Sequence, residues 1–441
     1  MMRTSIHTLA VALAALTISA PAAAQDDEPR GTKNTQTTIR GQSGSSASKS
    51  TEQAQTTKAE DKLSSGRKVE LSKEARKAIV ELQAAVTNRD VASIPGKLAA
   101  AQAVARTNDD KYVIAIYQTK AATDASDLAG MRAGIDALRA SGGAQNADLL
   151  ARYNNLGKRL YDAKQYDQAA AAFEAGLSVD PGNGDALKML ASTRETQGRG
   201  AEAVSLMAKS FVAAKAAGVK PKENDYKFAA RIAYDSKSPA AADVTRAWIA
   251  DYPNPTNWRD GLRIYRDVNG LEGDAKIDVM RLARAANALN GEGDYFAYVS
   301  ELVTRGYLNE AKAVIAEGAA KKAIDANKAA FKQFAPKLAK APARTTIDAV
   351  AKQALGAAGS GKTAMEAGDT LYGIGAFAEA APLFKAAVAK GGVDANLANL
   401  RLGMALARSG DKAGATAALN AVTGPQANIA KYWLIWVNGQ A

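Results

Sequence analysis

Residues 150–183 read LARYNNLGKRLYDAKQYDQAAAAFEAGLSVDPGN. Apolar and small residues recur in this stretch every three or four positions, which is the spacing of one face of an α-helix. The stretch ends in Pro181-Gly182-Asn183, and proline cannot continue a helix. The pattern therefore predicts two short antiparallel helices and an exit turn, which together form a helical hairpin.

This hairpin resembles one tetratricopeptide repeat. That motif places an aromatic residue, Leu-Gly and an apolar residue on its first helix. Alanine, an aromatic and a small residue follow on the second helix, and proline stands in the exit turn. Here these positions are held by Tyr153, Leu156, Gly157, Leu160, Ala169, Phe173, Gly176 and Pro181. The resemblance implies that Gly157 and Ala169 let two helix backbones approach, while the aromatic residues fill the seam between hairpins.

Further units with the same pattern follow. Residues 184–217 repeat it one period later, with Leu190, Ala191, Ala203 and Met207 at the matching positions. A second pair of units lies near the C-terminus, where the matching residues are Gly368, Ala380, Phe384, Ala387, Leu402, Gly403, Ala415 and Leu419. Residues 309–324, with Ala311 and Ile315, resemble another second helix.

The chain is therefore predicted to be all-α, an α-solenoid of tetratricopeptide-like hairpins with negligible strand content. We expect an N-terminal array over residues 67–220, a middle region over 221–345 and C-terminal units over 346–441. The middle region is open to two interpretations, hairpins or a non-repeating helical bundle. The last helix, residues 428–437, is either a cap over the open end of the array or an exposed docking patch.

The first residues have the features of an export signal. Arg3 is followed by the apolar run Leu9–Ile18, which is too short to span a bilayer, and Ala22-Ala23-Ala24 precedes acidic residues. We expect a signal peptide over residues 1–24 that is cleaved after Ala24, and hence a periplasmic protein of a Gram-negative bacterium. Within residues 25–66, the stretches 31–38 and 41–46 have no large apolar side chain, and the segment predicts a disordered linker. No other long apolar stretch follows, so an integral membrane protein is not expected.

Composition excludes most catalytic chemistry. The chain has no cysteine and a single histidine, His7, which lies inside the expected signal peptide. Disulfides, thiolate or imidazole metal sites, cysteine nucleophiles and histidine-based triads are thereby excluded from the mature chain. We expect no enzyme, no cofactor and no metal site.

One string could suggest nucleotide binding. Residues 356–363, GAAGSGKT, satisfy the phosphate-loop pattern, with Lys362 and Thr363 at the phosphate-binding and magnesium-binding positions. That pattern needs a buried strand before it, whereas residues 345–355 have the spacing of an amphipathic helix. We interpret the string as a chance match and keep nucleotide binding as a remote alternative.

The formal net charge is +12. Lysines occur throughout the chain, so a dispersed charge is expected rather than one basic patch. The charge also allows an anionic envelope polymer as a partner, whereas nucleic acid is not expected for an exported protein.

The resemblance implies a role. In this family the first helices of successive hairpins line a groove that binds a partner segment. The groove positions here are Asn154, Lys158, Tyr161, Lys188, Asp369, Tyr372 and Arg408. The predicted function is a non-enzymatic protein-interaction scaffold of the cell envelope. The alternatives are a component of envelope polysaccharide assembly or export, and a carboxylate-based polysaccharide-modifying enzyme on a helical scaffold.

Overall fold

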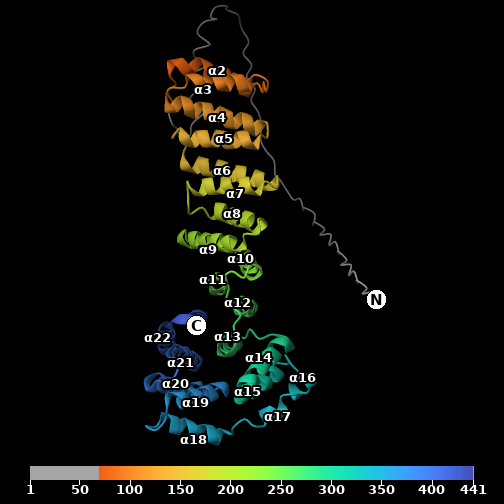
Figure 1. Ribbon diagram of the computed structural model, residues 1–441, viewed down its shortest axis with the longest axis vertical. Helices are drawn as coiled ribbons and strands as arrows, with labels where there is room; N and C mark the ends of the chain where they lie inside the picture. Colours follow the sequence, from red (N-terminus) through yellow and green to blue (C-terminus); the bar gives the residue numbers. More distant parts are fainter. Residues whose placement is uncertain (1–68, 441) are drawn as a thin grey trace, which may run out of the picture. The chain divides into compact units, whose positions relative to one another are not determined.

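The computed structural model describes residues 69–440, which belong to one compact unit over residues 60–441. Within the described range helix follows helix and no strand is present (Figure 1). The prediction of an all-α solenoid is therefore confirmed for these residues. The expected signal peptide, its cleavage after Ala24 and the linker over 25–66 lie outside them.

The N-terminal part consists of four antiparallel helical hairpins stacked in chain order (Figure 1). Their helices are α2 (Lys73–Thr87), α3 (Ile94–Val104), α4 (Asn108–Asp124), α5 (Leu128–Ala140), α6 (Asn146–Asp162), α7 (Tyr166–Leu177), α8 (Gly184–Thr196) and α9 (Gly200–Ala216). The stretch that resembles a repeat most closely forms α6 and α7.

Hairpins continue through most of the middle region. They are built from α10 (Glu223–Asp235), α11 (Ala241–Asp251), α12 (Pro255–Val268), α13 (Gly273–Ala285), α14 (Gly291–Arg305) and α15 (Leu308–Ala320). The pattern then breaks, because only two single-turn helices follow, α16 (Ala329–Lys332) and α17 (Ala335–Leu338).

The C-terminal part returns to paired helices. Its elements are α18 (Arg344–Leu355), α19 (Gly361–Gly373), α20 (Phe377–Lys390), α21 (Ala395–Ser409), α22 (Lys412–Asn420), a 3₁₀ turn (Gly424–Gln426) and α23 (Ala427–Asn438).

Short polar side chains start many of these helices. Thr107 and Asp110 form a capping box at α4, and Ser360 with Thr363 forms another at α19. Each pair satisfies backbone N–H groups that the first turn of a helix leaves without partners. Gly306 and Gly410 end α14 and α21 in the left-handed conformation, which glycine adopts without steric cost.

The two helices of a hairpin meet where the motif places glycine. A Cβ atom on Gly157 would lie 2.6 Å from the Phe173 ring, and one on Gly368 would lie 2.8 Å from the Phe384 ring. In the next hairpin, a Cβ atom on Gly403 would lie 2.5 Å from the Leu419 side chain. These separations are shorter than van der Waals contact, so a side chain at these positions would push the helices apart.

The last helix does more than close one end. Five α23 side chains are buried, namely Ile429, Ala430, Tyr432, Trp433 and Val437. The helix packs against its neighbours α21 and α22 and also against α11 and α13, which precede it by more than 140 residues. The Tyr432 hydroxyl lies 2.5 Å from Thr245 Oγ1 and donates to the carbonyl of Ala242. The solenoid therefore contacts itself between α11 and α23.

Candidate functional site

The expected groove residues of the first repeats lie on α6 and α8, which belong to successive hairpins. Lys158 is exposed and makes no ion pair or hydrogen bond with any residue in the 69–440 range. Asn154 is half-buried, and its side-chain oxygen faces Gly176 of α7 without a hydrogen-bond partner among the described atoms. Asn154 thus packs inside its own hairpin, while Lys158 is available to a partner.

Polar contacts join the first helices of consecutive hairpins. The Tyr161 hydroxyl of α6 lies 3.1 Å from Thr196 Oγ1 of α8. Lys188 of α8 lies 3.3 Å from Asp185 and 3.5 Å from Asp225 of α10. We call the surface formed by α6, α8 and α10 the N-terminal face.

A second ion pair extends this series. Arg231 of α10 donates to Glu195 of α8 at 2.9 Å. Tyr234, one turn further along α10, remains about half exposed. The N-terminal face is therefore polar, with charges of both signs. Two of its cations, the exposed Lys158 and the half-buried Arg159, form no ion pair with any described residue.

The C-terminal groove positions are arranged differently from the expectation. Asp369 and Tyr372 of α19 are only 5% and 3% exposed, so neither lies on an open surface. The reason is that α15 packs across α19. A Cβ atom on Gly373 would lie 2.7 Å from Glu310 of α15. Arg408 is half-buried, and its guanidinium stacks 4.4 Å from the centre of the Phe377 ring.

Asp369 instead belongs to a buried cluster of charges, which we call the buried ionic cluster. It contains two guanidiniums and three carboxylates, contributed by α13, α15, α19 and α21, and its members are Arg281, Arg401, Asp278, Glu310 and Asp369. Each of these side chains is almost entirely removed from solvent. The sequence analysis singled out only Asp369 of these five residues. The other four carry no signal of burial, because charged residues on a helix usually face solvent.

Both arginines bridge several helices. Arg281 donates to Glu310 at 2.7 Å, to Asp278 at 3.0 Å and to Asp369 at 3.3 Å. Arg401 donates to Asp369 at 2.5 Å and to Asp278 at 3.3 Å. The cluster therefore joins α13 to α21, whose paired residues are 123 positions apart.

Tyrosines enclose the cluster. Tyr298 donates to Glu310, and Tyr307 accepts from Arg401 while donating to the partly exposed Asp274. The Arg281 guanidinium lies 4.9 Å from the centre of the Tyr372 ring and 5.2 Å from that of Tyr307. Such stacking favours a desolvated cation.

The three carboxylates titrate differently. Burial raises the pKa of Asp278 and of Asp369, and the nearby arginines reverse only part of that effect. Burial also opposes ionisation of Glu310, but Arg281 and the Tyr298 hydroxyl outweigh it and hold the Glu310 pKa below its ordinary value. One Asp278 oxygen has no hydrogen-bond partner among the described atoms. The cluster holds more carboxylates than guanidiniums, and an excess buried charge of this kind is costly.

This cluster does not provide the carboxylate pair of a glycosidase. General acid and base groups must reach a substrate, whereas these oxygens are enclosed and bound to arginine. Among the described residues, no three His, Cys, Asp or Glu side chains are arranged so that they could hold a metal ion together. No helix within residues 69–440 combines the length and the apolar character that crossing a membrane requires.

Residues 356–360 of the phosphate-loop string connect two helices, and residues 361–363 form the first turn of the second helix, α19. The string follows α18, a helix rather than a strand, and Ser360 caps α19. The carbonyls of Gly356 and Gly359 accept hydrogen bonds from Lys390, and a Cβ atom on Gly361 would overlap the backbone of Gly391. The interpretation as a chance match agrees with this geometry, because a phosphate site needs converging N–H groups.

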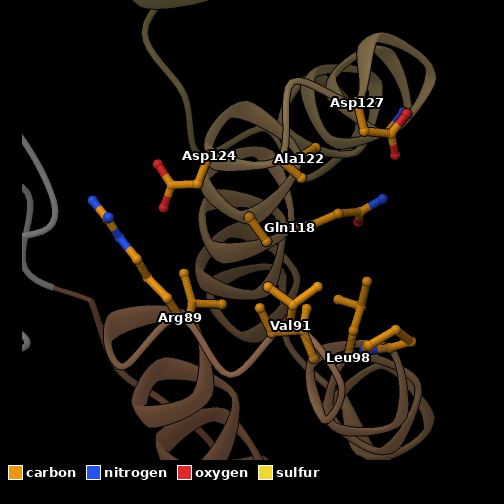
Figure 2. Close-up of a pocket in the computed structure, with 13 residues that line it drawn as sticks. Arg89, Val91, Leu98, Gln118, Ala122, Asp124 and Asp127 are labelled. Atoms are coloured by element: carbon orange, nitrogen blue, oxygen red, sulfur yellow. The ribbon is translucent and has the colours of Figure 1, made fainter.

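A concavity lies among the first helices of the unit. A hollow of about 440 Å³ separates the turn between α2 and α3 from the ends of α4 and α5 (Figure 2). Val91 and Leu98 form an apolar side, and Arg89 and Asp124 lie at one edge (Figure 2). Val91 is 70% exposed. No motif in the sequence marks this hollow.

Comparison with known families identifies two segments. Residues 160–210 match one family model described as a tetratricopeptide repeat, and residues 365–435 match another with the same description. The first segment runs from the end of α6 into α9, and the second from α19 into α23. No curated protein matches the chain. These two segments are thus similar to tetratricopeptide repeats, and the described residues fold as a tetratricopeptide-like α-solenoid.

Proposed function

We propose that the protein is a non-enzymatic interaction scaffold of the cell envelope, which binds a segment of a partner protein on its N-terminal face. Solenoids of this kind present extended surfaces assembled from consecutive repeats, and proteins are their usual partners. The observation that carries the proposal is the N-terminal face itself, where polar contacts hold α6, α8 and α10 together and leave Lys158 unpaired.

The charges on the N-terminal face indicate the chemistry of the partner segment that it would bind. Lys188 and Arg231 are already neutralised by acidic neighbours. Of the two α6 cations without an ion pair among the described residues, Lys158 is exposed and Arg159 is half-buried, so Lys158 is the better placed to meet an acidic group. A partner segment with a carboxylate opposite Lys158 and an apolar group near Tyr161 or Tyr234 fits the surface. The proposal that the protein is exported rests on the sequence of residues 1–24 alone.

Crosslinking in living cells tests this function. The tagged protein is crosslinked, purified and examined by mass spectrometry beside Lys158→Glu and Lys158→Glu/Lys188→Glu variants. The single variant is needed because Glu at position 188 would face Asp185 and Asp225 and could loosen α8. We expect a discrete envelope protein with the unchanged chain and at least a tenfold loss with both variants.

A matched control makes the same change of charge elsewhere. Lys209 and Lys312 are exposed on α9 and α15 and make no ion pair among the described residues, so Lys209→Glu/Lys312→Glu should retain the partner. Equal capture by all variants would place binding on another surface. Fractionation of the cells and mass spectrometry of the mature N-terminus test export, for which we expect a periplasmic chain that begins at Gln25.

A further inference from the structure

Half of the formal net charge lies in one segment. Residues 321–344 contain seven basic residues and one acidic residue, a net charge of +6, against +12 for the chain. We call this segment the basic strap. It is the part of the chain where the hairpin pattern breaks, between α15 and α18. Seven of the 57 basic residues lie in the strap, so basic residues occur throughout the chain as expected, but the local excess of positive over negative charge is high here.

The basic strap is anchored by its apolar residues. Phe331 and Phe334 are buried against Phe296 of α14, with ring centres 6.2 Å and 5.8 Å apart. Ile324 is buried in the same core. The lysines of the strap are all exposed, since the apolar residues take the inner side. The structure thus presents the charge on a surface that is held in place.

Much of this charge has no counter-ion among the residues that the structure describes. Lys321, Lys328 and Arg344 form ion pairs with acidic residues of neighbouring elements. The remaining four make no ion pair with any residue in the described part of the chain, and these are Lys322, Lys332, Lys337 and Lys340. Four uncompensated ammonium groups over a short segment produce a positive potential that attracts anions.

The next helix adds exposed apolar side chains. Val350 and Leu355 of α18 are 44% and 47% exposed, and only Ile347, Ala351 and Ala354 of that helix are buried. Figure 1 shows α16, α17 and α18 following one another at the lower end of the view. Val350 and Leu355 are five positions apart, so they lie on opposite flanks of the buried stripe of α18, and at most one of them faces the same side as the strap lysines. Lysines combined with an exposed aliphatic side chain suit the interface of an anionic bilayer.

We propose that the basic strap and α18 form a peripheral binding surface for an anionic lipid bilayer. Lysine ammonium groups pair with lipid phosphates, and one of the two exposed aliphatic side chains of α18, Val350 or Leu355, enters the boundary between headgroups and acyl chains. A bilayer fits better than an acidic polysaccharide, because both strap phenylalanines are buried and offer no ring for sugars to stack on. The inference does not depend on the N-terminal face.

Sedimentation with vesicles tests the proposal. The full chain is mixed with vesicles of phosphatidylcholine alone or of phosphatidylcholine with phosphatidylglycerol. We expect binding only to the anionic vesicles, weakened by added salt because the charges are exposed. The variant Lys322→Gln/Lys332→Gln/Lys337→Gln/Lys340→Gln should lose at least about 100-fold in affinity, since each lysine near such a surface contributes roughly fivefold.

Two further variants separate the possible causes. The control Lys73→Gln/Lys77→Gln/Lys209→Gln/Lys431→Gln removes the same charge from exposed positions elsewhere and should bind nearly as the unchanged chain does. The variant Val350→Ser/Leu355→Ser keeps every charge and should bind several-fold more weakly. All variants should melt at the temperature of the unchanged chain.

Three outcomes would overturn the proposal. The first is equal binding to neutral vesicles. The second is an equal loss in the strap and control variants. The third is unchanged binding of the serine variant together with equally tight binding of soluble polyglutamate, which would make the strap a general site for polyanions. Capture of a partner protein through Lys158 is independent of each of these outcomes.

Discussion

At the scale of single residues, glycine positions bring the paired helices together. Gly157, Gly368 and Gly403 each lie against a large side chain of the second helix of their hairpin. The motif predicts these positions because backbone approach depends on local spacing along the chain. A side chain there must displace a packed neighbour.

We expect Gly157→Val to destabilise the protein by about 1–3 kcal/mol, because its Cβ would overlap the buried Phe173 ring. Thermal and urea unfolding followed by circular dichroism measure the effect. Gly184→Ala is the matched control, since a Cβ atom there meets no atom within 4 Å. Equal stability of the two variants would contradict the packing argument.

The buried ionic cluster gives a second expectation at this scale. Arg281→Met removes the cation shared by Glu310, Asp278 and Asp369, and we expect a loss of about 3–5 kcal/mol in the free energy of unfolding. The exposed pair Lys120–Asp124 is the comparison, and Lys120→Met should cost about 0–1 kcal/mol. Similar losses in the two variants would show that the cluster contributes no more than a surface ion pair.

At the scale of elements, the helices and hairpins could be predicted and their long-range contacts could not. Helical spacing and turn residues are local, and they indicate the hairpins of residues 150–217 and the C-terminal units within residues 346–441. The burial of Asp369 depends on α15 packing across α19, and the local sequence of α19 carries no sign of that contact. For the same reason α23 was expected to be a cap or a docking patch, whereas its buried side also contacts α11 and α13.

The docking of α23 predicts a large effect of Trp433→Ala. The Trp433 side chain is completely buried, and its loss leaves a cavity that we expect to cost about 3–5 kcal/mol. Limited proteolysis should then cut within α21–α23 faster than in the unchanged chain. Lys431→Ala on the exposed side of α23 is the control and should unfold normally. An unchanged cleavage rate for Trp433→Ala would mean that α23 does not hold this region closed.

At the scale of the whole described unit, the buried ionic cluster should make stability depend on pH. Asp278 and Asp369 have pKa values raised above 3.8, so the folded state holds protons that the unfolded chain has released. Their contribution is present at low pH and is lost as the pH rises through the folded-state pKa values. Glu310 has the opposite effect, because its pKa is lowered in the folded state. Its contribution to stability is present above about pH 4.5 and is lost as the pH falls below that value.

The variant Asp278→Asn tests this dependence. Asparagine cannot ionise, so the variant should lose less stability than the unchanged chain as the pH rises above about 4. Melting temperatures measured between about pH 4 and 8 give both curves. Asp348→Asn, on the exposed side of α18, should reproduce the curve of the unchanged chain. Parallel curves for all three proteins would mean that Asp278 stays ionised throughout this range.

The contact of α23 with α11 has a consequence for how the chain folds. In an open solenoid each repeat touches only its neighbours, so folding spreads from any hairpin at little cost in loop closure. Here Thr245 meets a partner 187 residues later, and Asp278 meets Arg401 after 123 residues. During synthesis on the ribosome, each of the helices α2–α9 can pack against its neighbours in the stack as soon as it emerges. The carboxylate of Asp278 must wait for α19–α21, and distant pairings of this kind fold slowly. The C-terminal half is therefore the part of the chain that stays exposed to chaperones and proteases for longest.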